Sequence, residues 1–332
     1  MSGGRKIYVN AATQISLQQP LSEAWMTTPV WCNEPYSRCI DPNFREWLNP
    51  LESRRLGKIL KRALVTSLKV MRDTGITQPD AIITGTGLGC IEYTEQFLKQ
   101  LCLEGEELLK PTYFMQSTHN TISSLIAIQQ KCHGYNSTYS HRGVSFDSAL
   151  FDAFIQLRVG DIANALVTAN DEMTPVGFKI LQRTGYVGLP GQVTASEASM
   201  AMILSEESEK ALCEIVDMKM SFGQPDTTTW PLHVDAVLVG LSGSEQNDQA
   251  YQAIRQRYAS LPMLRYKHLF GECYSASGLG VYAAAHLLSQ GMAPSFMRCD
   301  GKTTALPLNR LLVVNHSDGD NFSYVLMQRV EE

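Results

Sequence analysis

Short apolar runs alternate along this chain with segments in which apolar residues recur at helical spacing. Apolar or alternating runs predict strands at 6–13, 81–84, 135–140, 164–170, 200–207, 213–222, 235–240, 309–315 and 323–329. Helical spacing predicts helices at 54–74, 91–105, 118–130, 147–159, 247–258 and 282–290. The ranges 17–50, 111–115 and 174–195 show neither pattern and are predicted to be irregular.

The order of these elements predicts the fold class. Strands that alternate with helices are typical of an α/β protein with a mostly parallel sheet. The order of the first part returns, shortened, in the second part, which indicates internal duplication. We therefore expect two halves, 1–207 and 208–332, within one compact unit, because no linker separates them.

Composition excludes several classes of function. The 332 residues carry a net charge of −5, which gives no basic surface for nucleic acid. No apolar run reaches the roughly 18 residues of a membrane helix, and the N-terminus has no apolar signal core, so we expect a cytoplasmic protein without membrane attachment. The eight cysteines form no CxxC pair, so we expect no metal site.

The glycine-rich stretch GTGLG (85–89) suggests a dinucleotide site only weakly. It lacks the GxGxxG spacing, and no acidic residue follows a second strand at the usual distance. We interpret it as a tight turn between a strand and a helix, and we expect no cofactor.

The stretch from His133 to Asp152 organises the rest of the chain. A polar strand, YNSTYS, leads into a tight turn at Arg142 and Gly143, and a helix begins behind Phe146. Three further segments stand in a fixed order around it: GDIANALVTANDEMTP (160–175), SEASMAMILSEE (196–207) and KHLFGECYSASGLG (267–280). The chain closes with NHSDGDNFSYVLMQR (315–329).

Together these segments resemble the β-ketoacyl-acyl-carrier-protein synthases, and the resemblance covers nearly the whole chain. It keeps Glu197 and Lys267 of the family's motifs. It implies a thiolase-like duplicated fold, layered αβαβα with two mixed five-stranded sheets, of which the second half is shortened here.

The reactive positions of that family are altered in this chain. The resemblance implies a nucleophilic cysteine and two histidines that stabilise the enolate and the oxyanion. The cysteine position falls on Gly143, the first histidine position near Ser242, within a residue or two, and the second on Glu272. Since none of these residues can take over the lost role, we expect no condensing activity from the chain alone.

Other residues offer a displaced nucleophile as an alternative. Cys132 and His133 precede the central strand, His141 adjoins the turn, and Cys273 follows Glu272. Neighbouring residues in a strand point to opposite faces, so Cys132 and His133 are not expected to share a pocket.

The pattern resembles the chain length factors, which are ketosynthase-like subunits without the cysteine. It implies a ketosynthase partner in a heterodimer, or a second copy in a homodimer, and an acyl carrier protein, in type II fatty acid or polyketide synthesis of the aryl polyene or flexirubin kind. An active 3-oxoacyl synthase or acyltransferase with a displaced nucleophile, and a separate acyl-binding protein, are the other two hypotheses.

The resemblance also assigns surfaces. The partner interface is expected at Tyr135, Asn136, Ser137, Thr138 and Tyr139, unless this strand is central within one subunit. The acyl tunnel is expected at Tyr113, Phe114, Met115, Thr118 and His119, unless these residues pack the core. Arg54 and Arg55, with Lys58, Lys61 and Arg62, form a basic run for carrier docking, for which a solvated helix face is the alternative.

Overall fold

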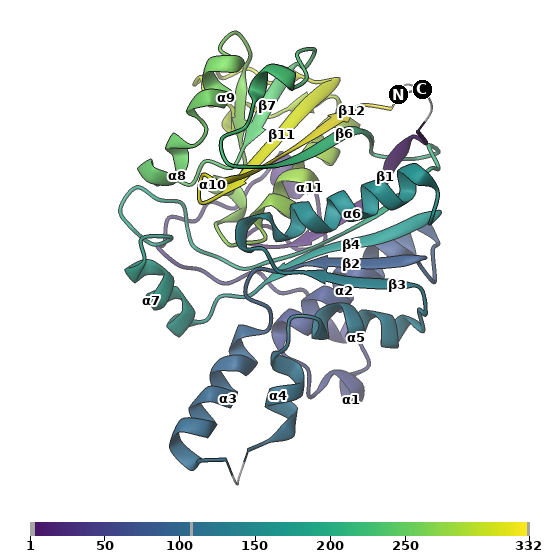
Figure 1. The fold of residues 1–332 in the computed structure, drawn as a ribbon, viewed down its shortest axis with the longest axis vertical. Helices are drawn as coiled ribbons and strands as arrows, with labels where there is room; N and C mark the ends of the chain where they lie inside the picture. The colour runs from purple at the N-terminus through teal and green to yellow at the C-terminus, as the bar shows by residue number, and fades with distance from the viewer. Residues whose placement is uncertain (1–3, 107–108, 331–332) are drawn as a thin grey trace.

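The computed structural model describes residues 4–106 and 109–330, in which ten strands form one continuous sheet. Five of them belong to the first half of the chain and five to the second (Figure 1). The first-half strands are β1 (Ile7–Ile15), β2 (Ala81–Gly85), β3 (Tyr135–Tyr139), β4 (Asn164–Asp171) and β5 (Ala198–Ser205). The second-half strands are β6 (Cys213–Phe222), β7 (Ala236–Val239), β8 (Met263–Arg265), β11 (Arg310–Ser317) and β12 (Asn321–Gln328).

The two halves repeat one topology. The first runs β3-β2-β4-β5-β1 across the sheet, and the second runs β8-β7-β11-β12-β6. In each, the second strand is parallel to both of its neighbours, and the last two pairings are antiparallel. Short antiparallel pairing of Ile7–Val9 with Cys213–Ile215 joins the halves edge to edge. The duplicated thiolase-like fold is thereby confirmed, with its two five-stranded halves continuous at this point.

Helices form three layers around the sheet. The central layer is α6 (Ser145–Val159) and α11 (Ala276–Gln290), and its side chains share one apolar core with both halves of the sheet. The first half is covered outside by α2 (Lys58–Thr74) and α5 (Thr121–Gln130). The second half is covered by the short helix α9 (Gln252–Arg257), which follows α8 (Glu245–Gln249). Burial of apolar side chains on both faces of the sheet is the main stabilising contribution.

The second half is shortened between its first two strands. Between β1 and β2 the chain forms η1 (Ala24–Met26), η2 (Phe44–Glu46), α1 (Pro50–Ser53) and α2. Between β6 and β7 it forms only η4 (Thr227–Thr229). The remaining short elements are α10 (Lys267–Phe270), β9 (Met292–Ala293), η5 (Ser295–Met297) and β10 (Leu306–Pro307).

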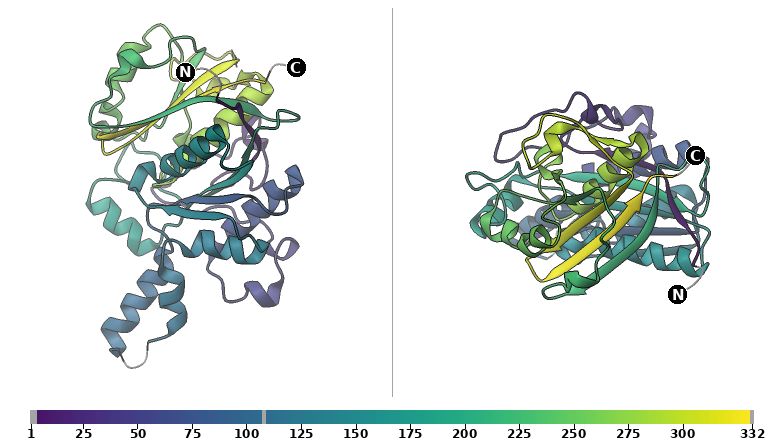
Figure 2. Two further views of the ribbon diagram at one scale, coloured as in Figure 1. Left: turned by 45° about the vertical axis from the view of Figure 1, so that its right-hand side comes forward. Right: turned by 90° about the horizontal axis from the view of Figure 1, so that it is seen from above.

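Two helices project away from the body. They are α3 (Ile91–Glu104) and α4 (Pro111–Ser117), which lie side by side below the sheet in Figure 1 and stand clear of it in the left view of Figure 2. We call this pair the projecting hairpin. The prediction that 111–115 is a loop was wrong, since Pro111 occupies the first position of a helix, where its missing N–H costs nothing.

Other boundaries also differ from the sequence prediction. The range 174–195 contains α7 (Pro175–Arg183), which Thr174 caps by accepting a hydrogen bond from the backbone of Gly177. The predicted helix at 247–258 is broken into α8 and α9. The helix predicted from 54 begins only at Lys58, so that Arg54 and Arg55 lie in the turn that precedes it. Within the described residues, no helix is both long and apolar enough to cross a membrane.

Candidate functional site

Gly143 lies where the polar strand ends and the central helix begins. It sits in the single turn η3 (Arg142–Val144), directly before α6. Its carbonyl oxygen accepts a hydrogen bond from Asn315 Nδ2 at 2.8 Å, and the same amide donates to Asp147 at 2.9 Å. A Cβ atom at Gly143 would meet Ser317 Oγ at 3.2 Å. The turn thus presents its glycine to the end of β11, with no reactive side chain.

Lys267 and Glu272 form a buried ion pair near this turn. Lys267 Nζ lies 2.6 Å from Glu272 Oε2, and only 8% and 4% of the two side chains are exposed. Tyr186 donates a second, longer hydrogen bond to Glu272 at 3.4 Å. Burial raises the pKa of Glu272, and the neighbouring Lys267 opposes that rise. The pair leaves no basic group free to assist decarboxylation.

Ser242 lines an outer pocket together with Glu272, but its polar groups are bonded within its own turn. Its hydroxyl accepts a hydrogen bond from Asn247 Nδ2 at 2.9 Å, and its backbone N–H donates to Asp248 Oδ1 at 2.9 Å, which closes the turn after β7. The position that faces the pair is Gly240, where a Cβ atom would lie 2.9 Å from Lys267 Cε. Gly240 lies within the residue or two that the count along the sequence allowed around Ser242, and its geometry favours it for the first histidine position.

The space in front of Gly240 is filled by aromatic side chains. The hydroxyls of Tyr266 and Tyr251 would lie 2.9 and 3.0 Å from a Cβ atom at Gly240. Both tyrosine rings are fully buried. A histidine has no room here without repacking of these rings.

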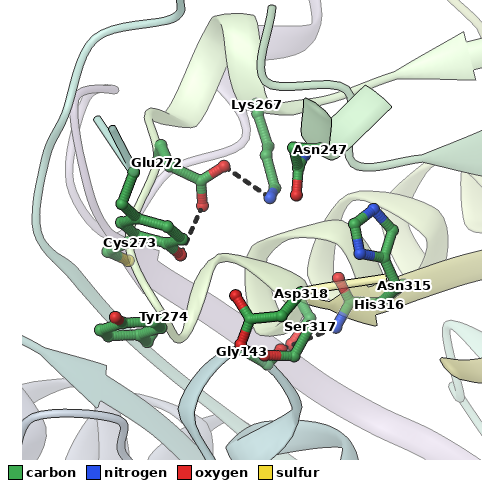
Figure 3. Close-up of a pocket in the computed structure, with 12 residues that line it drawn as sticks. Gly143, Asn247, Lys267, Glu272, Cys273, Tyr274, Asn315, His316, Ser317 and Asp318 are labelled. Carbon is green, nitrogen blue, oxygen red and sulfur yellow. Dashed lines mark hydrogen bonds and ion pairs between the residues drawn. The ribbon is translucent and has the colours of Figure 1, made fainter. Parts of the chain in front are cut away.

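The cavity between Gly143 and the ion pair is very small. Its volume is about 10 Å³, and its lining includes Asn247, Asn315 and His316 (Figure 3). A single water molecule needs roughly that much space. The inner cavity therefore has no room for an acyl chain. A shallower outer pocket of about 360 Å³, lined by Arg142 and Ser244 among others, adjoins it at Glu272 and Tyr274.

His316 is a site residue that the sequence interpretation missed. It lies in β11, one residue after Asn315, and its ring centroid is 4.6 Å from that of Tyr251. Burial lowers its pKa to about 4, so the imidazole is neutral at pH 7. The available signal was the histidine in the closing segment NHSDGDN, which by itself resembles no catalytic motif.

The residues weighed as displaced nucleophiles lack the environment that activates a thiol. Burial raises the pKa of Cys273 well above its usual value and also raises the pKa of Cys132. Catalytic thiols instead have a lowered pKa, because the thiolate is the nucleophile. His141 contacts Ser148 Oγ through Nδ1 at 3.1 Å. The expectation that Cys132 and His133 share no pocket was wrong, because both line one pocket at the opposite end of β3. They precede the strand, where the alternation of faces does not apply. None of the described His, Cys, Asp and Glu side chains gathers into a group of three or more that could hold a metal ion.

The candidate tunnel residues lie on the projecting hairpin and just after it. Phe114 is 58% exposed and Met115 is 69% exposed, so the alternative that they pack the core is wrong. Tyr113 contacts the ring of Tyr93 on α3, with centroids 6.0 Å apart. Thr118 and His119 follow α4 and are exposed.

The candidate interface strand is an edge strand. Among the described strands, β3 pairs only with β2, so the alternative of a central position is wrong. Tyr135 and Asn136 are exposed, and Ser137, Thr138 and Tyr139 are half-buried. The outer backbone groups of β3 therefore face away from the sheet and could pair with a further strand.

The basic run is only partly exposed. Arg54 and Arg55 are exposed, and Lys58 forms an ion pair with Asp41 at 3.0 Å. Arg62 is buried, with its guanidinium 2.6 Å from Asp41 and 2.9 Å from Glu197, so its place in a docking surface was wrong. The retained Glu197 thus anchors α2 and has no part in the cavity.

Comparison with known proteins agrees with this geometry. The model of the beta-ketoacyl synthase N-terminal domain matches residues 23–249, more than half of the chain. No curated protein sequence matches the chain. Among solved structures, the ishigamide ketosynthase/chain length factor superposes with a TM-score of 0.79 at 15% identity, over 99% of this chain and 100% of that one.

Two further structures share the fold. The complex of the ketosynthase ApeO with its chain length factor ApeC from Xenorhabdus doucetiae gives a TM-score of 0.76 at 13% identity, over 98% of each chain. The type II polyketide synthase complex AntDE:AntF, an acyl carrier protein with its ketosynthase bound to the hexaketide, gives 0.78 at 12% identity, over 99% of this chain and 100% of that one. With its fold and more than half of its sequence matched, the chain belongs to the beta-ketoacyl synthase family.

Proposed function

We propose that this protein is a chain-length-factor-type subunit that has lost condensing activity and pairs with an active ketosynthase. The observation that carries the proposal is the geometry of the site. Gly143 faces the buried Lys267–Glu272 ion pair across a cavity of about 10 Å³. A condensing enzyme needs a nucleophile, two groups that stabilise developing negative charge, and room for an acyl chain. This site supplies no activated thiol, its inner cavity has no room for an acyl chain, and Gly240 and Glu272 stand where we place the two histidines.

The exposed surfaces support a role in pairing. The open edge of β3 can continue the sheet into a partner. On the same side of the chain, the projecting hairpin exposes apolar side chains that a soluble monomer would normally cover, among them Leu98, Leu103, Phe114 and Met115. In this proposal the hairpin reaches into the partner and closes its acyl tunnel.

The structural relatives suggest the setting. Two of them contain a ketosynthase and a chain length factor, and a third contains a ketosynthase with an acyl carrier protein. We propose the same kind of partner here, in type II fatty acid or polyketide synthesis of the aryl polyene or flexirubin kind. The exposed Arg54 and Arg55 are then candidates for contact with an acidic carrier protein.

Acyl transfer and co-purification test the proposal. Incubation of the chain with acyl-loaded carrier protein should leave the intact mass of the chain unchanged. Wherever burial shifts the pKa of a described thiol, it raises that pKa and so disfavours the reactive thiolate. Co-expression with a ketosynthase that keeps its cysteine and both histidines should give a stable heterodimer in which only the ketosynthase is acylated. A stable thioester on any cysteine of this chain would favour an active synthase with a displaced nucleophile instead.

A further inference from the structure

The projecting hairpin has little core of its own. Its two helices contact each other through ring pairs such as Phe97 and Phe114, whose centroids are 5.6 Å apart, and most of its side chains are exposed or half-buried. On one flank, Tyr93 and Gln116 donate hydrogen bonds to the carbonyl of Arg55. The direction in which the hairpin points must therefore depend on how its base is held.

Asp171, the last residue of β4, holds the turn that begins the hairpin. This turn is the GTGLG stretch between β2 and α3. The carboxylate of Asp171 accepts hydrogen bonds from the backbone N–H of Leu88 at 2.8 Å, from that of Gly87 at 3.0 Å, and from the hydroxyl of Thr86 at 3.2 Å. Three consecutive residues of the turn are thus tied to one side chain.

The residues after Asp171 extend this contact along α3. Glu172 accepts a hydrogen bond from the backbone N–H of Glu92 at 2.9 Å, in the first turn of the helix. One turn further, the hydroxyl of Thr174 donates to the side chain of Glu95. The segment 171–174 therefore contacts the turn and the first helical turns of α3 in sequence.

The segment is itself fixed to the body. The carbonyl of Met173 accepts a hydrogen bond from Tyr36 at 2.5 Å, and its N–H donates to Glu197 at 3.4 Å. Asp171 also accepts a hydrogen bond from the hydroxyl of Ser275, directly before α11. Ser275 follows Glu272 by three residues. The carboxylate of Asp171 therefore connects the base of the hairpin with the segment that carries Glu272.

This arrangement uses buried acidic groups without ion-pair partners. Asp171 and Glu172 are 2% and 3% exposed, and neither forms an ion pair with a described Lys, Arg or His. Burial of a carboxyl group in this way is unfavourable unless hydrogen bonds compensate for it. Most of the compensating donors for these two groups belong to the hairpin base.

We propose that Asp171 is a positioning residue, which fixes the angle at which the projecting hairpin leaves the body and so the depth at which Phe114 and Met115 reach a partner. The effect on the partner rests on the function proposed above. The effect on the hairpin is a property of this chain alone and can be measured separately.

Hydrogen exchange of Asp171→Asn tests the effect on the hairpin. The asparagine is uncharged, and its N–H₂ group replaces one of the two carboxylate oxygens, both of which accept from the N–H of Gly87. Amides of 86–117 should exchange about tenfold faster or more, as expected for the loss of hydrogen bonds to a charged acceptor, while those of α6 and α11 stay unchanged. Ser275→Ala is the matched control, because it removes one contact of Asp171 and leaves all three contacts to the turn.

Product length tests the effect on the partner. In a heterodimer with an active ketosynthase, Asp171→Asn should broaden the distribution of product lengths, whereas Ser275→Ala should not. If Asp171→Asn fails to fold, Thr86→Val removes one contact from the hairpin side and should give a smaller change in the same direction.

The outcomes separate this proposal from the one on which it rests. Uniform acceleration of exchange over the whole chain, or none in the hairpin, would overturn the positioning role. A second outcome is that Asp171→Asn speeds exchange in the hairpin and leaves the product length unchanged, while Phe114→Ala changes the product length. That result would overturn only the link between the hairpin angle and product length. Unchanged product in both variants would overturn the tunnel function itself, and the link with it.

Discussion

Lys267 Nζ and Glu272 Oε2 lie 2.6 Å apart in the interior, with both side chains buried. The two residues are at the ends of the short segment that contains α10, so a local turn brings their charges together. In the family that the chain resembles, the position of Glu272 carries a catalytic histidine. Here the carboxylate of Glu272 neutralises the charge of Lys267, so the two side chains form an ion pair.

We expect the pair to stabilise the fold as a unit. Lys267→Met leaves a buried carboxyl without a partner and should lower the free energy of unfolding by about 3–5 kcal/mol, as should Glu272→Leu. The double variant removes both charges and should recover most of that loss. Guanidinium unfolding of the four proteins measures the coupling, and losses that simply add in the double variant would contradict it.

The glycine of the turn gives a second prediction. Gly143→Cys should fold, because the backbone there has no positive φ and the only tight contact of a Cβ atom, at 3.2 Å, is with the Ser317 hydroxyl, which needs to shift only slightly. It should not restore condensation, because Gly240 and Glu272 still supply no imidazole, and catalytic groups that act together are non-additive. Product analysis with acyl and malonyl carrier protein checks this. Elongation above that of the unaltered chain would show that the other two positions are assigned wrongly.

The fold could be predicted from the sequence because the periodicity of apolar residues and the order of the motifs extend over long segments of the chain. Alternating strands and helices, and the return of that order after residue 207, follow from which faces are buried. Helix ends and short helices were less predictable. In α7, only nine residues are helical, which is short for a periodic pattern, and the apolar Val176 and Ile180 are exposed. In α4, exposed Phe114 and Met115 obscured the periodicity in the same way.

The site was predicted only in part, because side-chain direction within a turn depends on three-dimensional contacts. Counting along the chain brought Gly143 and Glu272 to the same cavity but placed the third position on Ser242. Its hydroxyl is turned toward Asn247, and only the structure shows that Gly240 faces Lys267. Arg62 carried no sequence signal of burial either, because its partners Asp41 and Glu197 are distant along the chain.

Glu172 gives a pH-dependent prediction. Burial is the main reason that its pKa rises from 4.5 to about 8. The hydrogen bond from the backbone N–H of Glu92 and the charge of Arg62 oppose the rise, and the charges of Glu92 and Glu197 add to it. Between pH 4.5 and about pH 8, Glu172 in the folded chain keeps a proton that it has released in the unfolded chain. The free energy of unfolding therefore falls as the pH rises through this range. Each pKa unit corresponds to about 1.4 kcal/mol, so the fall is on the order of a few kcal/mol.

The variant Glu172→Gln isolates this effect. Its amide still accepts the hydrogen bond from Glu92 but has no proton to lose, so its stability relative to the unaltered chain should increase from pH 5 to pH 8 and then level off. Urea unfolding across this range measures the difference, in which the titration of other buried acids cancels. The exposed Glu209→Gln serves as control and should show no such trend. Parallel stability curves for Glu172→Gln and the unaltered chain would disprove the assignment.

The last prediction concerns the tip of α4. Phe114 is exposed in this chain and contacts the ring of Phe97, so Phe114→Ala should lower the stability of the isolated chain by no more than about 1.5 kcal/mol, the usual worth of an aromatic pair. This is well below the roughly 3–5 kcal/mol that removal of a core phenylalanine costs. If Phe114 closes the acyl tunnel of the partner, its removal frees space there. Each additional buried CH₂ gains about 0.8 kcal/mol, so the heterodimer should make longer products without losing activity.

Met115→Ala should act in the same direction, by a smaller step because less volume is removed. Phe222→Ala is the matched control, since that phenylalanine is also exposed but lies at the end of β6 in the other half of the chain. Product mass spectra and thermal melting of each purified pair separate the possible roles. Longer products from Phe114→Ala and unchanged products from Phe222→Ala support the tunnel. A weakened heterodimer with products of unchanged length would leave Phe114 a role in pairing alone.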